Sequence, residues 1–181
     1  GEAFLSDLLD GLISRTGMLW NMYGPTETTV WSLCYPLTNT GEPIYIGKPI
    51  ANTQVYILDE YYQPVPIGVA GELYIGGDGV SAGYLGREDL TSERFIADPF
   101  TASDSARLYR TGDLVRMRAD GNIDYISRID NQVKVRGFRI ELGEVENVLS
   151  TYSSIDQAVV NVCDYGEGDQ RLVAYSVPQE G

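Results

Sequence analysis

One run of nine residues combines an aromatic ring, a tight turn, hydroxyls and one acid: Asn21-Met22-Tyr23-Gly24-Pro25-Thr26-Glu27-Thr28-Thr29. An adenine can stack on Tyr23, Thr26 can donate to a phosphate oxygen, and Glu27 offers the hard oxygen ligands that suit Mg²⁺. Residues 18–20 are a short apolar strand that Gly24-Pro25 should end, so these side chains should gather at its carboxyl end. Taken alone, the run is more typical of a turn with a capping threonine.

A second candidate is the acid in the segment Tyr109-Arg110-Thr111-Gly112-Asp113-Leu114. The glycine ends a predicted strand and places Asp113 at its rim. A carboxylate accepts at least two hydrogen bonds, so Asp113 can hold both hydroxyls of a ribose. Taken alone, Thr-Gly-Asp is a common turn.

Two further segments have patterns that admit simpler interpretations. Residues 127–146 set four cations among four acids across one predicted strand and one helix start, which by itself is typical of a solvated face. Residues 71–85 are a strand that runs into a glycine-rich loop. The spacing of its glycines does not fit a dinucleotide-binding motif, so we predict a hairpin there.

Together, in this order, the four segments resemble the amino-acid adenylation domains of nonribosomal peptide synthetases. These belong to the superfamily that includes acyl-CoA synthetases and firefly luciferase. The resemblance runs from residue 1 to residue 175. It implies that an amino acid is activated by ATP to an aminoacyl adenylate, with release of diphosphate, and is then loaded as a thioester on phosphopantetheine.

The resemblance also implies what this chain works with. The small molecules are ATP or AMP, Mg²⁺ and a small amino acid, and the phosphopantetheine belongs to a peptidyl carrier protein domain. The remaining part of the adenylation domain and neighbouring synthetase modules are the other expected partners. The family's lysine-bearing phosphate loop would precede Gly1 and its C-terminal catalytic lysine would follow Gly181. We therefore expect an interior or C-terminal fragment of an amino-acid adenylating ligase, inactive when isolated.

Roles for single residues follow from the matched motifs. Catalytic roles fall on Thr26, Glu27 and Arg128, with Glu27 as the metal ligand. Contacts to the nucleotide or to phosphopantetheine fall on Tyr23, Gly24, Thr26, Asp113, Tyr125, Arg128 and Gly137. A position in the barrel core is an equal alternative for Tyr125.

The resemblance places the amino-acid side chain against Met22, Val30 and Trp31. These residues are bulky and uncharged, so they predict a small apolar substrate, with glycine first and alanine second. The alternative is that Trp31 turns into the core, as tryptophans on strands often do.

The expected fold is α+β and strand-rich. Residues 1–127 should form the C-terminal part of the adenylation core, namely an amphipathic helix near residues 3–16, the motif loop and a distorted β-barrel. The predicted strands include residues 54–58, 72–75, 107–109, 114–118 and 123–127, with a hairpin turn at Asp120-Gly121. Residues 128–181 should begin a small α+β lid. In the family this lid rotates between two poses, and Asp130 matches its pivot.

Composition excludes several classes of protein. The net charge of −13, with no basic cluster in the sequence, argues against nucleic acid or an anionic membrane as a partner. The chain has no histidine, which excludes a histidine-based triad, and its two cysteines lack metal-ligand spacing. We expect two buried thiols and a cytoplasmic protein. Two other functions stay open: an acyl- or aryl-CoA-type adenylate-forming ligase, and a non-catalytic fragment or scaffold.

Overall fold

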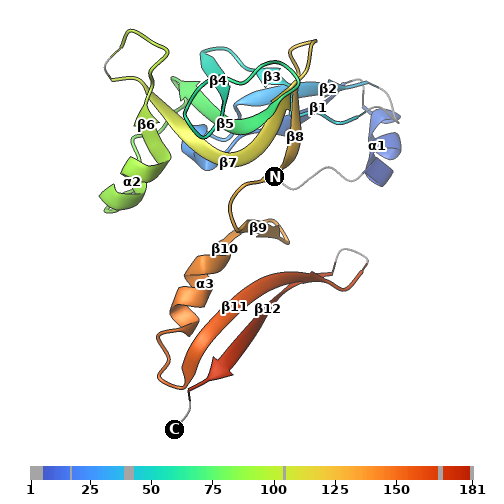
Figure 1. The fold of residues 1–181 in the computed structure, drawn as a ribbon. Helices are drawn as coiled ribbons and strands as arrows, with labels where there is room; N and C mark the ends of the chain where they lie inside the picture. The colour runs from blue at the N-terminus through green and yellow to red at the C-terminus, as the bar shows by residue number, and fades with distance from the viewer. Residues whose placement is uncertain (1–5, 17, 39–42, 104, 167–168, 180–181) are drawn as a thin grey trace. The chain divides into compact units, whose positions relative to one another are not determined.

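The computed structural model describes residues 6–16, 18–38, 43–103, 105–166 and 169–179. The chain divides into two compact units that meet in sequence between Ile129 and Asp130. Figure 1 shows both units as ribbons coloured along the chain.

The first unit is built mainly from antiparallel strands. Its elements are α1 (Ser6–Ile13), β1 (Leu19–Tyr23), the single 3-10 turn η1 (Thr26–Thr28), β2 (Leu33–Leu37), β3 (Lys48–Pro49), β4 (Thr53–Leu58), β5 (Ala70–Gly77), α2 (Glu88–Arg94), β6 (Phe95–Ala97), β7 (Arg107–Met117) and β8 (Ile123–Arg128). One sheet has the order β1-β2-β3, and the other has the order β4-β5-β7-β6 with β8 also on β7. The predicted strand-rich α+β class is confirmed. Among the described residues the strands form these open sheets and do not close into a barrel.

The strand β7 is the spine of the larger sheet and appears in yellow in Figure 1. The sequence predicted two strands here, over residues 107–109 and 114–118, but the chain forms a single strand. Its first residues pair with β6 and its last with β8. Opposite β5 the register jumps from Leu114 facing Glu72 to Arg110 facing Tyr74, so β7 bulges at residues 111–113. Because of this bulge, the sequence did not indicate that the strand is continuous.

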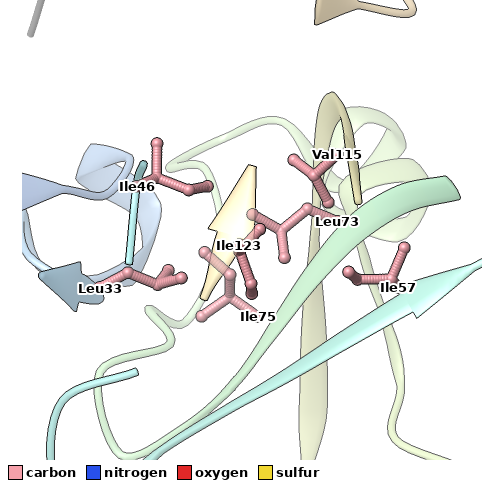
Figure 2. Close-up of a cluster of buried hydrophobic side chains, with 7 residues drawn as sticks. All are labelled: Leu33, Ile46, Ile57, Leu73, Ile75, Val115 and Ile123. Carbon is pink, nitrogen blue, oxygen red and sulfur yellow. The ribbon is translucent and has the colours of Figure 1, made fainter. Parts of the chain in front are cut away.

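The main core lies around β5, and its side chains point toward one another in Figure 2. Its buried members are Leu33, Ile46, Ile57, Leu73, Ile75, Val115 and Ile123. Tyr74 points to the opposite face of β5, where it packs with Leu58 and Leu108. Because both faces of β5 are buried, a one-residue slip would exchange the side chains of the two faces and disrupt both clusters, so the register is firmly fixed.

Two loop predictions had different outcomes. Asp120 and Gly121 form the predicted turn between β7 and β8, with Gly121 at a φ of 80°. The hairpin predicted within residues 71–85 is wrong, because β5 ends at Gly77 and the chain then loops into α2. The loop packs against the motif after β1 instead, where the Ser81 N–H donates to the Glu27 carbonyl.

The second unit contains a short hairpin, a helix and a long hairpin. The elements are β9 (Gln132–Val135), β10 (Phe138–Glu141), α3 (Leu142–Leu149), β11 (Ile155–Asp164) and β12 (Gln170–Pro178). Arg136 and Gly137 have φ values of 52° and 82°, the pattern of a two-residue type I′ turn. The sequence predicted one strand where this hairpin lies. The helix α3 packs beside β11, where the Val160 N–H donates to Glu146 Oε1 at 2.8 Å. In the described part of the chain, none of the helices has the length and apolar character needed to span a membrane.

Two glycines of the first unit give a matched test of backbone packing. Gly47 and Gly68 both have a φ of 88°, but a Cβ on Gly47 would lie 1.9 Å from the Cys34 carbonyl oxygen, whereas none of the described atoms lies within 4 Å of one on Gly68. Gly68→Ala should cost only the left-handed strain, about 1–2 kcal/mol. Gly47→Ala should cost about 1–3 kcal/mol more, because the backbone must shift. Urea unfolding of both variants measures the difference, and equal losses would contradict it.

Candidate nucleotide site

The centre of the candidate site is the carboxylate of Asp113. Its Oδ1 accepts a hydrogen bond from Arg128 Nη1 at 2.8 Å, and its Oδ2 accepts the hydroxyl of Tyr23. The side chains of Asp113 and Arg128 are only 9% and 14% exposed. Three strands contribute these groups: β7, β8 and β1. The structure therefore brings together three of the residues predicted from sequence.

The bulge of β7 takes Asp113 out of register with β5, while Asp113 still pairs with Arg128 of β8. Gly112 has a φ of 74°, a conformation that glycine adopts without strain. The Asp113 N–H donates to the hydroxyl of Thr111 at 3.0 Å, and that hydroxyl donates to the Leu73 carbonyl at 2.8 Å. On the other edge, the Ile129 N–H donates to the Gly112 carbonyl at 2.9 Å. The Thr111 side chain and Ile129, the residue after β8, thus satisfy backbone groups of the bulge that a regular β ladder would pair.

Tyr23 acts in this group as a hydrogen-bond donor. Burial raises the pKa of its phenol well above the ordinary value, and the neighbouring Asp113 carboxylate raises it further. The phenol is therefore neutral and keeps its proton at physiological pH. Its ring also packs against the main core. A carboxylate that accepts from a hydroxyl and a guanidinium is chemically suited to accept the hydroxyls of a ribose.

The motif loop after β1 has a strained backbone. Thr29 and Val30 have φ values of 62° and 72°, and the Trp31 N–H closes a three-residue turn on the Thr29 carbonyl at 2.9 Å. A β-branched residue such as valine seldom adopts a positive φ. Such a conformation costs on the order of 1–3 kcal/mol and tends to occur at functional sites.

Close packing holds this loop in place. The Ser32 N–H donates to the Tyr23 carbonyl at 2.8 Å, and the hydroxyls of Ser32 and Thr28 are 2.6 Å apart. A Cβ on Gly24 would lie 2.5 Å from the Val30 carbonyl oxygen. Gly24 is therefore needed for the chain to fold back on itself, which gives it a structural role beside the predicted one.

Glu27 is tied to the glycine-rich loop after β5. Its Oε1 accepts the hydroxyl of Tyr84 at 2.7 Å, and its carbonyl accepts the N–H of Ser81 at 2.9 Å. A Cβ on Gly79 would lie 2.9 Å from the Thr28 carbonyl oxygen, so this glycine allows the two loops to meet. Sequence reasoning missed Tyr84. The sequence feature that could have pointed to Tyr84 is its place in a glycine-rich loop that lacks a dinucleotide-binding motif.

Tyr84 is itself held firmly. Its N–H donates to the Thr91 hydroxyl at 2.9 Å, and its ring meets that of Phe95 edge to face at 5.5 Å. Burial raises the pKa of the Tyr84 phenol, and the hydrogen bond to Glu27 raises it further. The phenol therefore remains a donor that orients the Glu27 carboxylate.

The donor set around Glu27 fits Mg²⁺. Among the described residues, no three side chains of histidine, cysteine, aspartate or glutamate gather into a metal cage. Mg²⁺ commonly binds one or two carboxylates together with substrate phosphates and waters. The half-buried Glu27 carboxylate, next to the exposed Thr26, matches that arrangement.

The remaining predicted residues of the first unit lie toward its surface. Tyr125 on β8 is 43% exposed, so the alternative position in the core is wrong. Val30 and Trp31 are each 58% exposed, which also rules out the core position for Trp31. Met22 is half-buried on β1, and the alternation of side chains along a strand places it on the opposite face from Tyr23.

In the second unit the predicted residues occupy turns. Gly137 lies in the β9–β10 turn, and Asp130 Oδ1 accepts the Gln132 N–H at 3.2 Å. The two cysteines, Cys34 and Cys163, are free thiols and half-buried rather than fully buried as expected.

Comparison with known proteins places this geometry in a family. The model of the AMP-binding enzymes matches residues 1–85. The dimodular nonribosomal peptide synthase of Bacillus subtilis is 55% identical over 179 residues, which is 98% of this chain and 7% of that protein. The chain spans 2 to 7% of the length of the first curated relatives it matches.

Two solved structures support the same placement. A four-domain nonribosomal peptide synthetase bound to AMP and glycine, holo-AB3403, is 51% identical with a TM-score of 0.66, over 99% of this chain and 14% of its own. PA1221, which contains adenylation and carrier domains, is 31% identical with a TM-score of 0.83, over 99% of this chain and 37% of its own. The chain therefore belongs to the AMP-binding enzymes, as a segment of an amino-acid adenylation domain of the nonribosomal peptide synthetase type.

Proposed function

We propose that this chain supplies the ribose- and adenine-binding part of a domain that activates a small amino acid with ATP. The products are an aminoacyl adenylate and diphosphate, and the amino acid then passes as a thioester to the phosphopantetheine of a carrier domain. The observation that carries the proposal is the buried group formed by Tyr23, Asp113 and Arg128. The solved relative bound to AMP and glycine agrees with it in both nucleotide and amino acid.

Each member of this group has a distinct task in the proposal. Asp113 accepts the ribose hydroxyls, and the ring of Tyr23 gives the adenine an apolar face. Arg128 also donates to the Thr111 carbonyl at 3.0 Å, so the guanidinium is fixed in orientation. A fixed cation beside the nucleotide can offset negative charge without reorganising during the reaction.

The motif loop would bind the phosphates of ATP and the metal that accompanies them. The exposed Thr26 hydroxyl donates to the α-phosphate, and Glu27 binds the metal that accompanies ATP. When bound, Mg²⁺ neutralises charge that develops on the phosphate oxygens. Tyr84 holds the Glu27 carboxylate in place, so the metal ligand is oriented before the nucleotide arrives.

The second unit would act as the beginning of a mobile lid. The boundary between the two units lies between Ile129 and Asp130. This position supports Asp130 as the pivot. Hinge residues absorb changes in backbone dihedral angles at a few positions. In this proposal Gly137, in the β9–β10 turn, lies near phosphopantetheine when the thioester forms. Adenylation-carrier proteins among the solved relatives support such a carrier partner.

The test is ATP–diphosphate exchange by the full-length protein, measured with every proteinogenic amino acid, fatty acids and aryl acids. We expect exchange that depends on an amino acid and on Mg²⁺. Exchange only with fatty or aryl acids would favour the acyl-CoA type of ligase. No exchange with any acid would overturn the proposal and favour a scaffold.

A further inference from the structure

A buried acid outside the nucleotide site, Glu72, contacts the β7 bulge that carries Asp113. Glu72 on β5 is 9% exposed, and four hydrogen bonds reach its carboxylate. Arg110 Nε donates to both oxygens at 2.9 and 3.0 Å, the Gly112 N–H donates to Oε1 at 3.1 Å, and the Tyr74 hydroxyl donates to Oε2 at 3.2 Å. Nothing in the proposed reaction uses this group directly.

The position of Glu72 explains why these contacts matter. It is the last β5 residue in register before the bulge, facing Leu114. The bulge carries Gly112 and Asp113, and the Gly112 N–H has Glu72 rather than a strand carbonyl as its acceptor. A buried N–H that loses its partner is costly, so the backbone would shift to find another. Any such shift moves Asp113, the next residue.

We propose that Glu72 is a positioning residue for nucleotide binding, holding the β7 bulge so that Asp113 meets Tyr23 and Arg128. This inference rests on the proposed function of Asp113 as the ribose ligand. Glu72 holds the backbone within the bulge through the Gly112 N–H, and it holds the side chain of Arg110, the residue just before the bulge. It acts through Asp113 and makes no contact with the nucleotide itself.

The test compares three variants of Glu72 in the full-length protein. Glu72→Ala removes the acceptor, and we expect ATP to bind at least tenfold more weakly, which is about 1.4 kcal/mol. Glu72→Gln keeps an oxygen for the Gly112 N–H and should stay within about threefold of the wild type. Glu72→Asp withdraws the carboxylate by one methylene and should fall between them. Calorimetric titration gives the Kd for ATP, and exchange kinetics give the KM for the amino acid, which should not change.

A matched control separates positioning from general stability. Asp124→Asn removes the ion pair between Arg116 Nη2 and Asp124 Oδ2, 2.6 Å long, which also joins β7 to a neighbouring strand but lies away from the bulge. It should leave the Kd for ATP unchanged. If Glu72→Ala does not fold, Glu72→Asp carries the test, and wild-type ATP affinity in that variant would overturn the inference.

A double-mutant cycle decides whether Glu72 acts through Asp113. In the Asp113→Ala background, Glu72→Ala should change the Kd for ATP by less than about twofold, because the group it positions is gone. An undiminished effect in that background would overturn the inference while leaving the proposed function intact. A wild-type protein that neither binds ATP nor exchanges diphosphate would instead refute the proposed function.

Discussion

Replacing Asp113 with alanine should weaken ATP binding by about 10- to 100-fold. A hydrogen bond to a charged group contributes about 1.5–3 kcal/mol, and Asp113 is the acid that faces the ribose in the proposed site. The same change removes the carboxylate that pairs with the charge of the Arg128 guanidinium, whose side chain is 14% exposed, although the Thr111 carbonyl still accepts from it. Leaving a buried charge without its partner costs about 3–5 kcal/mol. The variant should therefore lose both nucleotide affinity and stability.

Asp113→Asn separates these two losses. The asparagine keeps the size of the side chain and one oxygen acceptor, so Arg128 retains a partner, but the amide NH₂ replaces the oxygen that accepts from Tyr23 or from a ribose hydroxyl. Calorimetric titration with ATP and urea unfolding should show a large loss of affinity with a smaller loss of stability. The Asp124→Asn variant is the control for removal of a carboxylate from this sheet. If Asp113→Asn binds ATP as tightly as the wild type, Asp113 is a turn residue and does not bind the ribose.

Glycine should be the preferred amino acid of the full-length protein, with alanine second and large side chains rejected by at least about 100-fold. The predicted pocket residues Met22, Val30 and Trp31 are bulky and uncharged. The exposure of Val30 and Trp31, 58% each, leaves them available to a substrate rather than committed to the core. A pocket filled in this way rejects large residues firmly but separates glycine from alanine only modestly, because one methylene is worth about 1–3 kcal/mol.

Trp31→Ala tests this directly, because it removes the largest of the three side chains. Exchange with leucine or phenylalanine, relative to glycine, should rise by at least about tenfold, the effect of one to two methylene equivalents. Trp20→Ala is the matched control, since Trp20 is the other tryptophan of the chain and is also exposed, at 45%. It should leave the preference unchanged. A wild-type preference for an aromatic, acidic or basic amino acid would contradict the pocket assignment.

Much of the fold was predictable because local patterns encode it. Alternating apolar residues marked β4, β5 and β8, and Asp120-Gly121 marked a hairpin turn whose positive φ suits glycine. The motif loop and Asp113 were identified from residue type and from the resemblance to a family. These features depend on neighbours within a few residues, and the sequence displays such neighbours directly.

The strand-rich class, the main turns and the identity of the acids and the aromatic ring in the proposed site could all be predicted from the sequence. How these groups are held depends on contacts between distant parts of the chain. Tyr84 reaches Glu27 across 57 residues, and Glu72 reaches Gly112 across 40. The bulge that aims Asp113 exists only because β5 and β7 pair in one particular register. Register is set by which side chains the shared core can bury, and that choice involves the whole sheet at once.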